Sequence, residues 1–136
     1  MWIFTQHGYI SVVQHFSPTP GAELLMRARS FDHLSALLSL VMPQEEADDR
    51  ILHTRENDYP YRVPVSREFF AKVVGASMAQ LDYSNFKNRC AETLGRPDAR
   101  VLGEIWAETQ SFTRNQDQRQ VSTLKGQVSV DDEGGV

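Results

Sequence analysis

The side chains best suited to chemistry in this chain are arginines and tyrosines that lie close together in the sequence. Arg27 and Arg29 are two residues apart, and the phrase DYPYR at 58–62 places Tyr59 and Arg62 three residues apart. A guanidinium group is always charged and presents several donors in a planar fork, which suits phosphate and carboxylate groups. These residues therefore indicate a site for an anionic ligand.

A second phrase, DYSNFK at 82–87, adds an aromatic side chain and a cation. If Asp82 is the N-cap of a helix, its carboxylate accepts from an amide of the first turn. Tyr83 and Lys87 then lie four residues apart on one face, where they can stack on each other or face a ligand together. The structural interpretation is favoured, and the binding interpretation stays open.

Other kinds of reactive site have little support in the sequence. His7, His15, His33 and His53 are scattered without the spacing of metal ligands, and Cys90 is the single cysteine. Neither a glycine-rich phosphate loop nor a nucleophile elbow is present. We therefore expect no metal, no cofactor and no catalytic residue, and a small buried thiol at Cys90 is favoured over a nucleophile.

Length and charge limit the kind of protein that this chain can be. It has 136 residues, 40% of them hydrophobic, which is enough for one domain with a substantial core. The net charge of −4 argues against nonspecific binding of a phosphate backbone, so nucleic acid is the less favoured partner. Residues 59–114 nevertheless hold eight basic and six acidic side chains, and an anionic ligand is expected to prefer this segment.

The N-terminal residues and the longest apolar run indicate a cytoplasmic protein. MWIFTQHGYI has no basic segment ahead of an apolar one, so it is not typical of a secretion signal. The most apolar run, at 34–42, is far shorter than the roughly 20 residues that span a bilayer. A lone cysteine fits a reducing compartment. We expect no membrane span, and the oligomeric state is left open.

The elements that would position the arginines begin with three expected strands. Residues 2–5 and 9–15 are rich in β-branched and aromatic side chains, and His7-Gly8 between them is typical of a tight turn with a positive φ at glycine. The segment 23–30 alternates in polarity. Because successive side chains of a strand face opposite sides, two sets are expected. The core set is Leu24, Met26 and Ala28, and the opposite set is Leu25, Arg27 and Arg29.

Residues 50–66 alternate again and predict a hairpin that turns at Asn57-Asp58. Pro60 and Pro64 indicate an edge or irregular strand, because proline cannot donate to a ladder. The alternation places four residues on the core side, namely Tyr59, Tyr61, Val63 and Val65. Arg62 then lies on the opposite face, either solvated, paired with an acid, or beside Arg27 and Arg29. Three guanidinium groups on one face repel unless an internal acid or an anionic ligand lies among them.

Four helices are expected near 32–42, 67–80, 83–94 and 98–113, separated by breakers such as Pro43 and by an acidic solvated loop at 44–49. Ser66 can cap the second helix. In the last helix five apolar side chains are expected to pack inward, namely Val101, Leu102, Ile105, Trp106 and Phe112. Trp2 is expected in the core or at its rim.

Together these elements predict an α+β domain with an antiparallel sheet of about four strands and three to four helices packed mainly on one face. The domain is expected to cover residues 1–114. Residues 115–136 lose large apolar side chains and gain Gln, Asp and Gly, which is typical of a flexible tail.

The order of these phrases resembles a family of small, uncharacterised proteins from bacterial and phage genomes. The resemblance covers roughly residues 2–112, and its most specific element is the ordered pair D-Y-x-Y-R and D-Y-x-N-F-K. It implies a shared fold and a shared site without an established reaction. The residues that match are Arg27, Arg29, Asp58, Tyr59, Tyr61, Arg62, Asp82, Tyr83, Asn85, Phe86 and Lys87.

These observations favour a non-catalytic binding module for a protein partner or for a small anionic, nucleotide-like ligand. The size, the charge and the resemblance to phage proteins would suit a phage-encoded inhibitor of host defence. The alternative is a small enzyme acting on a phosphorylated or nucleotide substrate, with Tyr83 or a histidine as acid or base. The expected ligand-binding residues are Arg27, Arg29, Tyr59, Arg62, Tyr83 and Lys87.

Overall fold

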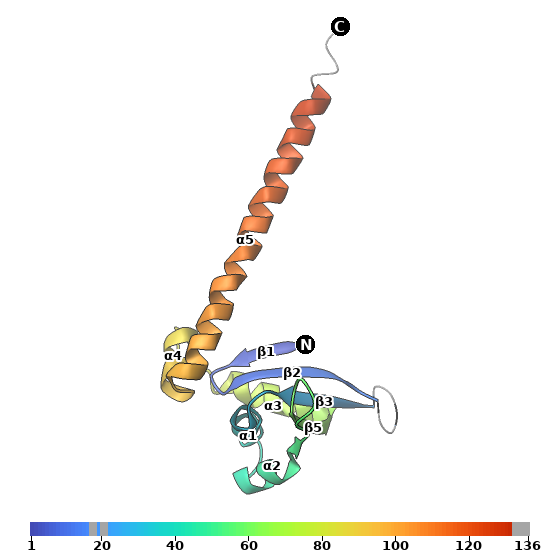
Figure 1. Cartoon of the computed structure of the whole chain (residues 1–136), viewed down its shortest axis with the longest axis vertical. Helices are drawn as coiled ribbons and strands as arrows, with labels where there is room; N and C mark the ends of the chain where they lie inside the picture. Colours follow the sequence, from blue (N-terminus) through green and yellow to red (C-terminus); the bar gives the residue numbers. More distant parts are fainter. Residues whose placement is uncertain (17–18, 20–21, 132–136) are drawn as a thin grey trace. The chain divides into compact units, whose positions relative to one another are not determined.

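In the described residues five strands form one antiparallel sheet, in the spatial order β1-β2-β3-β5-β4 (Figure 1). The computed structural model describes residues 1–16, 19 and 22–131, and the side chains of residues 127–131 are left undescribed. The two-residue β4 pairs with β5 in the hairpin predicted over 50–66. It raises the number of strands to five, one more than the roughly four that the sequence predicts. The strands are β1 (Trp2–Thr5), β2 (Gly8–His15), β3 (Glu23–Ala28), β4 (Leu52–His53) and β5 (Tyr61–Ser66).

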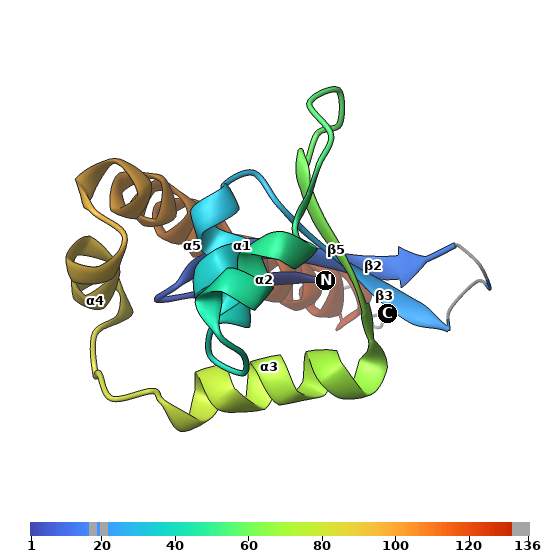
Figure 2. The ribbon, with the colours of Figure 1, turned by 90° about the horizontal axis from the view of Figure 1, so that it is seen from below.

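Five helices accompany the sheet within the part of the chain that the structure describes, so the α+β class predicted from the sequence is confirmed. They are α1 (Phe31–Leu38), α2 (Gln44–Arg50), α3 (Arg67–Ala79), α4 (Phe86–Thr93) and α5 (Arg96–Asp131). Seen from below, α1 and α2 lie in front of the strands and α3 lies beside them (Figure 2). The chain divides after Ala99 into two compact units, and the sheet and the first four helices belong to the first unit.

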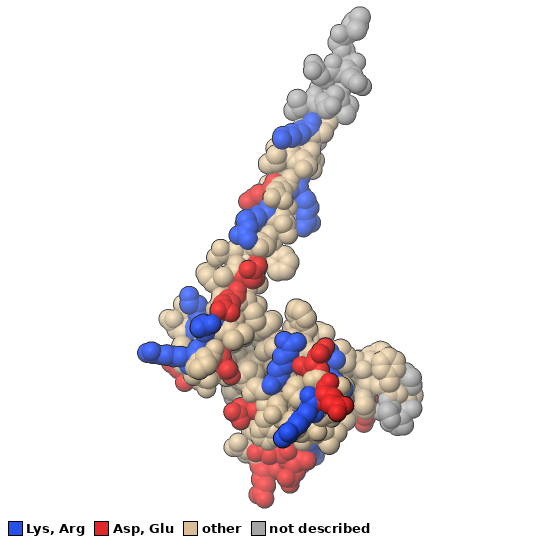
Figure 3. Space-filling view, viewed as in Figure 1, with Lys and Arg blue, Asp and Glu red and all other residues tan. Residues whose placement is uncertain are grey.

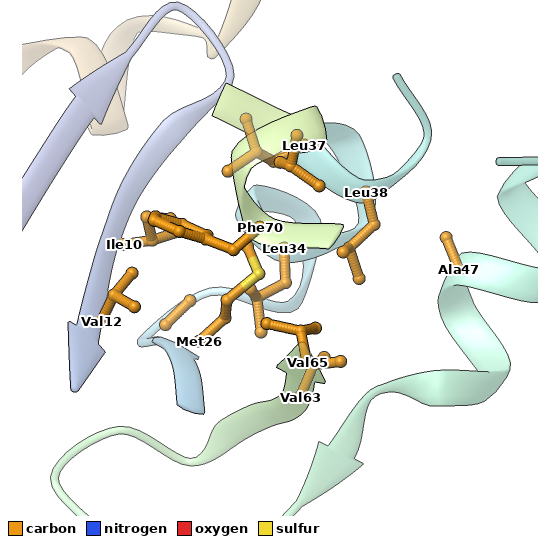
Figure 4. Packing of buried hydrophobic residues seen from close by; sticks show 12 residues of the cluster. Ile10, Val12, Met26, Leu34, Leu37, Leu38, Ala47, Val63, Val65 and Phe70 are labelled. Atoms are coloured by element: carbon orange, nitrogen blue, oxygen red, sulfur yellow. The ribbon is translucent and has the colours of Figure 1, made fainter. Parts of the chain in front are cut away.

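The core of the first unit lies between the sheet and the helices α1 and α3 (Figure 4). The alternation predicted for β3 is confirmed, because Met26 and Ala28 are fully buried. Val63 and Val65 of β5 are buried on the same side, as predicted. The buried apolar residues are Ile10, Val12, Met26, Ala28, Leu34, Leu37, Leu38, Ala47, Val63, Val65, Phe70 and Val73. Full burial of such a side chain contributes about 1.5–3 kcal/mol, so this layer fixes which face of the sheet turns inward.

The β1–β2 turn has the predicted glycine conformation. Gly8 has a φ of 125°, which residues with a side chain rarely adopt. The backbone of Gly8 also lies against the ring of His33, leaving no room for a Cβ atom. The β4–β5 hairpin turns within residues 54–60, as expected. The pairing of β4 with β5 covers Tyr61 and Arg62 and does not reach Pro64. At Pro64 the described ladder pairs β5 with β3 on one side, so a proline is tolerated there.

The acidic segment after Pro43 is a helix, so the predicted loop at 44–49 is wrong. Glu45 and Glu46 lie in the first turn of α2 and Arg50 in its last turn, which matches the sign of the helix dipole at both ends. Ala47 is fully buried and anchors the helix. The acidic side chains form the red cluster at the bottom of Figure 3.

The N-cap of α4 is Asn85 and not Asp82. The side-chain oxygen of Asn85 accepts from the amide of Asn88 at 3.0 Å, and the helix begins at Phe86. Asp82 instead pairs with Arg89 at 3.2 Å. Tyr83 therefore precedes the helix, and the predicted helical face shared by Tyr83 and Lys87 does not form. Both Asp and Asn are strong N-caps, so residue preference alone does not decide between the two positions.

We expect Asn85→Ala to lower the free energy of unfolding by about 1 kcal/mol, because it removes a helix cap. Asp82→Ala removes an ion pair whose carboxylate is 66% exposed. Such pairs contribute between about 0 and 1 kcal/mol, so its effect should be the smaller one. Urea denaturation of both variants measures the difference. A larger loss in Asp82→Ala would contradict the cap at Asn85.

The helix α5 runs well beyond the domain end predicted at residue 114. Residues 115–131 continue it as regular helix, and the first compact unit ends at Ala99. The domain bounds predicted from the sequence stay a prediction. Flexibility of this segment stays a prediction, and residues 132–136 lie outside the described residues. None of the described helices combines the length and the apolar character needed to cross a membrane.

Several aromatic and apolar side chains expected in the core are exposed. Val101, Trp106 and Phe112 of α5 are 52%, 56% and 73% exposed, and Trp2 is 70% exposed. The spacing of Val101 and Phe112 places both side chains on the same side of a helix, but it does not show whether another part of the protein packs against that side. The expectation of inward packing is wrong for Val101, Trp106 and Phe112, and Trp2, predicted in the core or at its rim, does not lie in the core.

Candidate functional site

A row of directly paired residues crosses the sheet on the face opposite to the core. Trp2 pairs with Ser11, Ser11 with Arg27, and Arg27 with Arg62, so the row runs through β1, β2, β3 and β5. Directly opposite residues of antiparallel strands lie on the same face, with Cβ atoms roughly 5 Å apart. Arg27 and Arg62 therefore share one face, as the alternation of their strands predicts, and two like charges lie side by side.

The ring of Tyr59 contacts two of the arginines. The Cζ atoms of Arg27 and Arg29 are 4.6 and 4.9 Å from its centroid, within the range of cation–π contacts. Tyr59 was expected on the core side with Val63, and this is wrong. Because β5 begins at Tyr61, the alternation does not extend back through Pro60, and Tyr59 turns to the arginine face. It is 9% exposed there.

Main-chain oxygens and one hydroxyl accept the hydrogen bonds of these arginines. Arg62 Nε donates to the carbonyl of Tyr59 at 3.1 Å, and Arg29 Nε donates to the carbonyl of Asp58 at 3.2 Å. Arg27 Nη2 donates to Ser11 Oγ at 2.8 Å, whereas its Nε is buried and has no partner. Among the ion pairs of the described residues, none includes these arginines. Figure 3 shows both basic and acidic side chains around the β4–β5 hairpin.

Aromatic side chains of β1 and β2 continue the same face. Phe4 and Tyr9 are paired across the two strands and stack with centroids 4.7 Å apart. The Trp2 ring stands perpendicular to Tyr9, at 6.3 Å. The hydroxyl oxygens of Tyr9 and Tyr59 are 2.8 Å apart and form a hydrogen bond. We call this surface the aromatic–arginine face; its residues are Trp2, Phe4, Tyr9, Ser11, Arg27, Arg29, Tyr59 and Arg62.

The hydroxyl of Tyr9 is held in its neutral form. Burial, followed by the hydrogen bond to Tyr59 and the charge of that group, raises the pKa of Tyr9 to about 12, although Arg29 and Arg27 lower it. Burial is also the first cause of the raised pKa of Tyr83. At neutral pH the Tyr9 hydroxyl therefore adds no negative charge to balance the arginines.

This shift predicts a loss of stability at alkaline pH. Since the pKa of Tyr9 is higher in the folded protein than its ordinary value of 10.0, its contribution is fully present below pH 10.0 and is lost as the pH rises through about 12. Urea denaturation at a series of pH values should show this decline, and Tyr9→Phe should flatten it. An unchanged decline in Tyr9→Phe would mean that another group causes it.

Tyr83 and Lys87, the other two expected ligand-binding residues, lie away from this face. Tyr83 lines an apolar cavity of about 320 Å³ with Ile3, Leu37 and Val74, on the helix-covered side of the sheet. Its ring is 5.6 Å from Arg89 Cζ. Lys87 is exposed on α4. The structure therefore brings together Arg27, Arg29, Tyr59 and Arg62 but does not add the DYSNFK residues to them.

A smaller hollow of about 180 Å³ is lined by the titratable side chains of His7, Asp32, His33 and Asp98. His33 Nε2 lies 2.9 Å from Asp98 Oδ2, and His33 Nδ1 accepts from the amide of Tyr9 at 3.3 Å. Both ring nitrogens are thus engaged, so His33 has a structural explanation. His7 lines the same hollow, and burial lowers its pKa.

Neither a metal ligand set nor a reactive thiol emerges from the described part of the chain. It contains no group of three or more His, Cys, Asp and Glu residues that could hold a metal ion. Cys90 is 1% exposed, and burial raises the pKa of its thiol, which suppresses the nucleophilic thiolate. The expectation of a buried thiol is confirmed.

The sequence alone did not indicate four members of the aromatic–arginine face. The sequence assigns Phe4, Tyr9 and Ser11 only to strands, and Trp2 to the core or its rim. The pairing of β1 and β2 with β3 is needed to place them beside the arginines. The available signal was the alternation itself. In β1 and β2 every second residue belongs to one face, and the face that lacks Ile3, Ile10 and Val12 carries the aromatic rings.

Comparisons of this chain with protein-family models, with curated proteins and with solved structures found no match. The family resemblance inferred from DYPYR and DYSNFK therefore stays a prediction.

Proposed function

We propose that the protein is a non-catalytic binding module whose aromatic–arginine face binds a small anionic ligand of the nucleotide type. The observation that carries this proposal is the pairing of Arg27 with Arg62 on a sheet face where no ion pair of the described residues includes either arginine. Like charges directly opposite each other destabilise a sheet, so a bound anion would remove an unfavourable interaction as well as add contacts.

The internal partners of the arginines do not neutralise them. The ring of Tyr59 and the carbonyls of Tyr59 and Asp58 attract cations but carry no net charge. A phosphate group among the guanidinium groups would supply that charge and accept several donors at once. Each charge-assisted hydrogen bond contributes about 1.5–3 kcal/mol, so two or three of them suffice for a specific site.

The aromatic residues of the face suit the base of a nucleotide, as the arginines suit its phosphate. A base or a similar flat ring could stack on the Phe4–Tyr9 pair beside the arginines. Tyr59 would hold Arg27 and Arg29 in place, and the Ser11 hydroxyl fixes one end of Arg27. A nucleotide combines one flat ring with one or more phosphates, which is why this class of ligand fits best.

The alternative of a small enzyme has less support. Its suggested acid or base, Tyr83, lines a separate cavity, and His33 is engaged through both ring nitrogens. A role as a phage-encoded inhibitor that sequesters a nucleotide signal of host defence would require only binding. Nucleotide ligands and a lone cysteine are also in keeping with a cytoplasmic protein.

The test is a thermal-shift screen of the full chain with nucleoside mono-, di- and triphosphates at low salt. At least one nucleotide should raise the melting temperature of the wild type, because it binds only the folded state. The variant Arg27→Gln/Arg29→Gln/Arg62→Gln should lose this rise. Arg62→Gln alone should weaken it, which keeps the test valid if the triple variant does not fold.

The matched control is Arg50→Gln/Arg100→Gln/Arg114→Gln, which removes the same number of charges at exposed positions outside the face. It should respond to the nucleotide like the wild type. If no nucleotide shifts the wild type, or if both triple variants respond alike, the proposed function is wrong.

A further inference from the structure

We propose that the ligand of the aromatic–arginine face is a single strand of nucleic acid that crosses the sheet from β1 to β5. This inference rests on the proposed function and goes beyond it, because it replaces a mononucleotide with a polymer. The acidic net charge of the whole chain argues against nonspecific binding of this kind. The face itself, however, gathers three arginines that have no carboxylate partner among the described residues.

The first argument is the span of the face. The paired row from Trp2 to Arg62 crosses three steps between neighbouring strands, which amounts to about 14 Å at the usual strand spacing. In a mononucleotide the base and its first phosphate are joined by a single sugar. One such unit could occupy the arginine end or the tryptophan end of the row, but a chain of nucleotides would occupy both.

The second argument is that the face offers more than one surface for stacking. The Trp2 ring is nearly perpendicular to Tyr9, with an interplanar angle of 89°, whereas Phe4 lies nearly parallel to Tyr9, at 14°. Two flat bases could therefore stack in different orientations, one on Trp2 and one on the Phe4–Tyr9 pair. Exposed aromatic rings on a sheet, each stacking a separate base, are a common way of binding single strands.

The third argument is the separation of charge from aromatic surface. The arginines lie on β3, on β5 and just after β3, while Trp2, Phe4 and Tyr9 lie on β1 and β2. In a nucleic-acid strand that crosses the sheet, the bases at one end would stack on β1 and β2, and the phosphates at the other end would meet Arg27 and Arg62. Phosphate contacts of this kind position the strand without reading its sequence, so we expect binding with little sequence preference.

Fluorescence anisotropy with labelled oligothymidylate and oligouridylate of about ten nucleotides tests the inference, since single-strand sites have about this length. We expect the affinity of both oligonucleotides to be at least about tenfold higher than the affinity of thymidine or uridine monophosphate, measured by competition. With three phosphates contacted, the logarithm of the affinity should fall with the logarithm of the salt concentration at a slope of about −2. A duplex of the same length should bind less tightly, because its bases are not available for stacking.

Variants separate the inference from the proposed function. Trp2→Ala should weaken oligonucleotide binding by about tenfold, and Trp2→Phe should restore most of the loss. Trp106→Ala, which removes the chain's other tryptophan, is the matched control and should bind like the wild type. The triple arginine-to-glutamine variant should lose both kinds of ligand.

The outcomes are distinct. If the oligonucleotides bind no more tightly than the mononucleotides, or if Trp2→Ala binds them like the wild type, the single-strand inference is wrong. The proposed function would then still stand, provided that a mononucleotide binds and the triple variant loses it. If neither kind of ligand binds, both proposals fail.

Discussion

Gly8→Ala should be among the most destabilising single substitutions in this protein, with a loss of about 2–6 kcal/mol in the free energy of unfolding. A Cβ atom at residue 8 would lie 2.2 Å from Cγ of His33 and 2.7 Å from its Cβ. These atoms are at the base of the imidazole side chain, so a rotation of the ring cannot clear them. The positive φ of 125° adds backbone strain of its own.

The position of His33 explains why the structure cannot easily relax around this change. The Tyr9 amide and the Asp98 carboxylate hold its two ring nitrogens. Moving the ring would break contacts that link α1 to β2 and to the first turn of α5. We therefore expect a loss of cooperativity in Gly8→Ala as well as a lower midpoint in urea, followed by circular dichroism.

Gly75→Ala is the matched control for this prediction. Gly75 lies in α3 with no heavy atom within 4 Å of the added Cβ, so alanine should stabilise the protein by up to about 1 kcal/mol through its higher helix propensity. In the background His33→Ala, Gly8→Ala should be less harmful, because part of the clash is gone. Equal losses in both backgrounds would contradict the role of His33.

The elements predicted correctly are those whose local pattern and tertiary environment agree. In β3 the burial of Met26 and Ala28 follows from the alternation, and in α3 the Ser66 hydroxyl accepts from the Phe69 amide as an N-cap. The acidic helix α2 was missed because its single buried contact is Ala47, which leaves too short an apolar pattern. The extension of α5 past residue 114 was missed for a related reason, since a helix without a continuous apolar stripe resembles a polar tail.

The site shows the same limit at the level of strand pairing. Alternation places Arg27 and Arg62 on the outward faces of their own strands, but only the register of β3 with β5 makes them neighbours. The prediction for Tyr59 is wrong because it extends the alternation of β5 back through Pro60, which lies outside the strand. The likeness of DYPYR to DYSNFK carried no spatial information, and Tyr83 belongs to a different cavity. Local patterns therefore predict on which face of the sheet a side chain lies, whereas the long-range pairing of strands decides which residues lie beside it.

Arg62→Glu should separate a binding role of Arg62 from a structural one. A glutamate at this position would lie directly opposite Arg27, where opposite charges stabilise a cross-strand pair by about 0.2–1 kcal/mol. The lost donation from Arg62 Nε to the Tyr59 carbonyl offsets this gain. The free energy of unfolding should therefore change by less than about 1 kcal/mol, as measured in urea.

The affinity for an anionic ligand should respond very differently. Arg62→Glu removes one charge-assisted contact and adds a repulsion, so nucleotide or oligonucleotide binding should weaken by at least about a hundredfold. Arg100→Glu makes the same change of net charge at a residue whose side chain is 81% exposed on α5, and it should bind almost as the wild type does. If Arg62→Glu instead unfolds the protein, the arginine is chiefly structural. If stability and affinity both stay near the wild-type values, the anion does not lie between Arg27 and Arg62, and the face needs a different occupant.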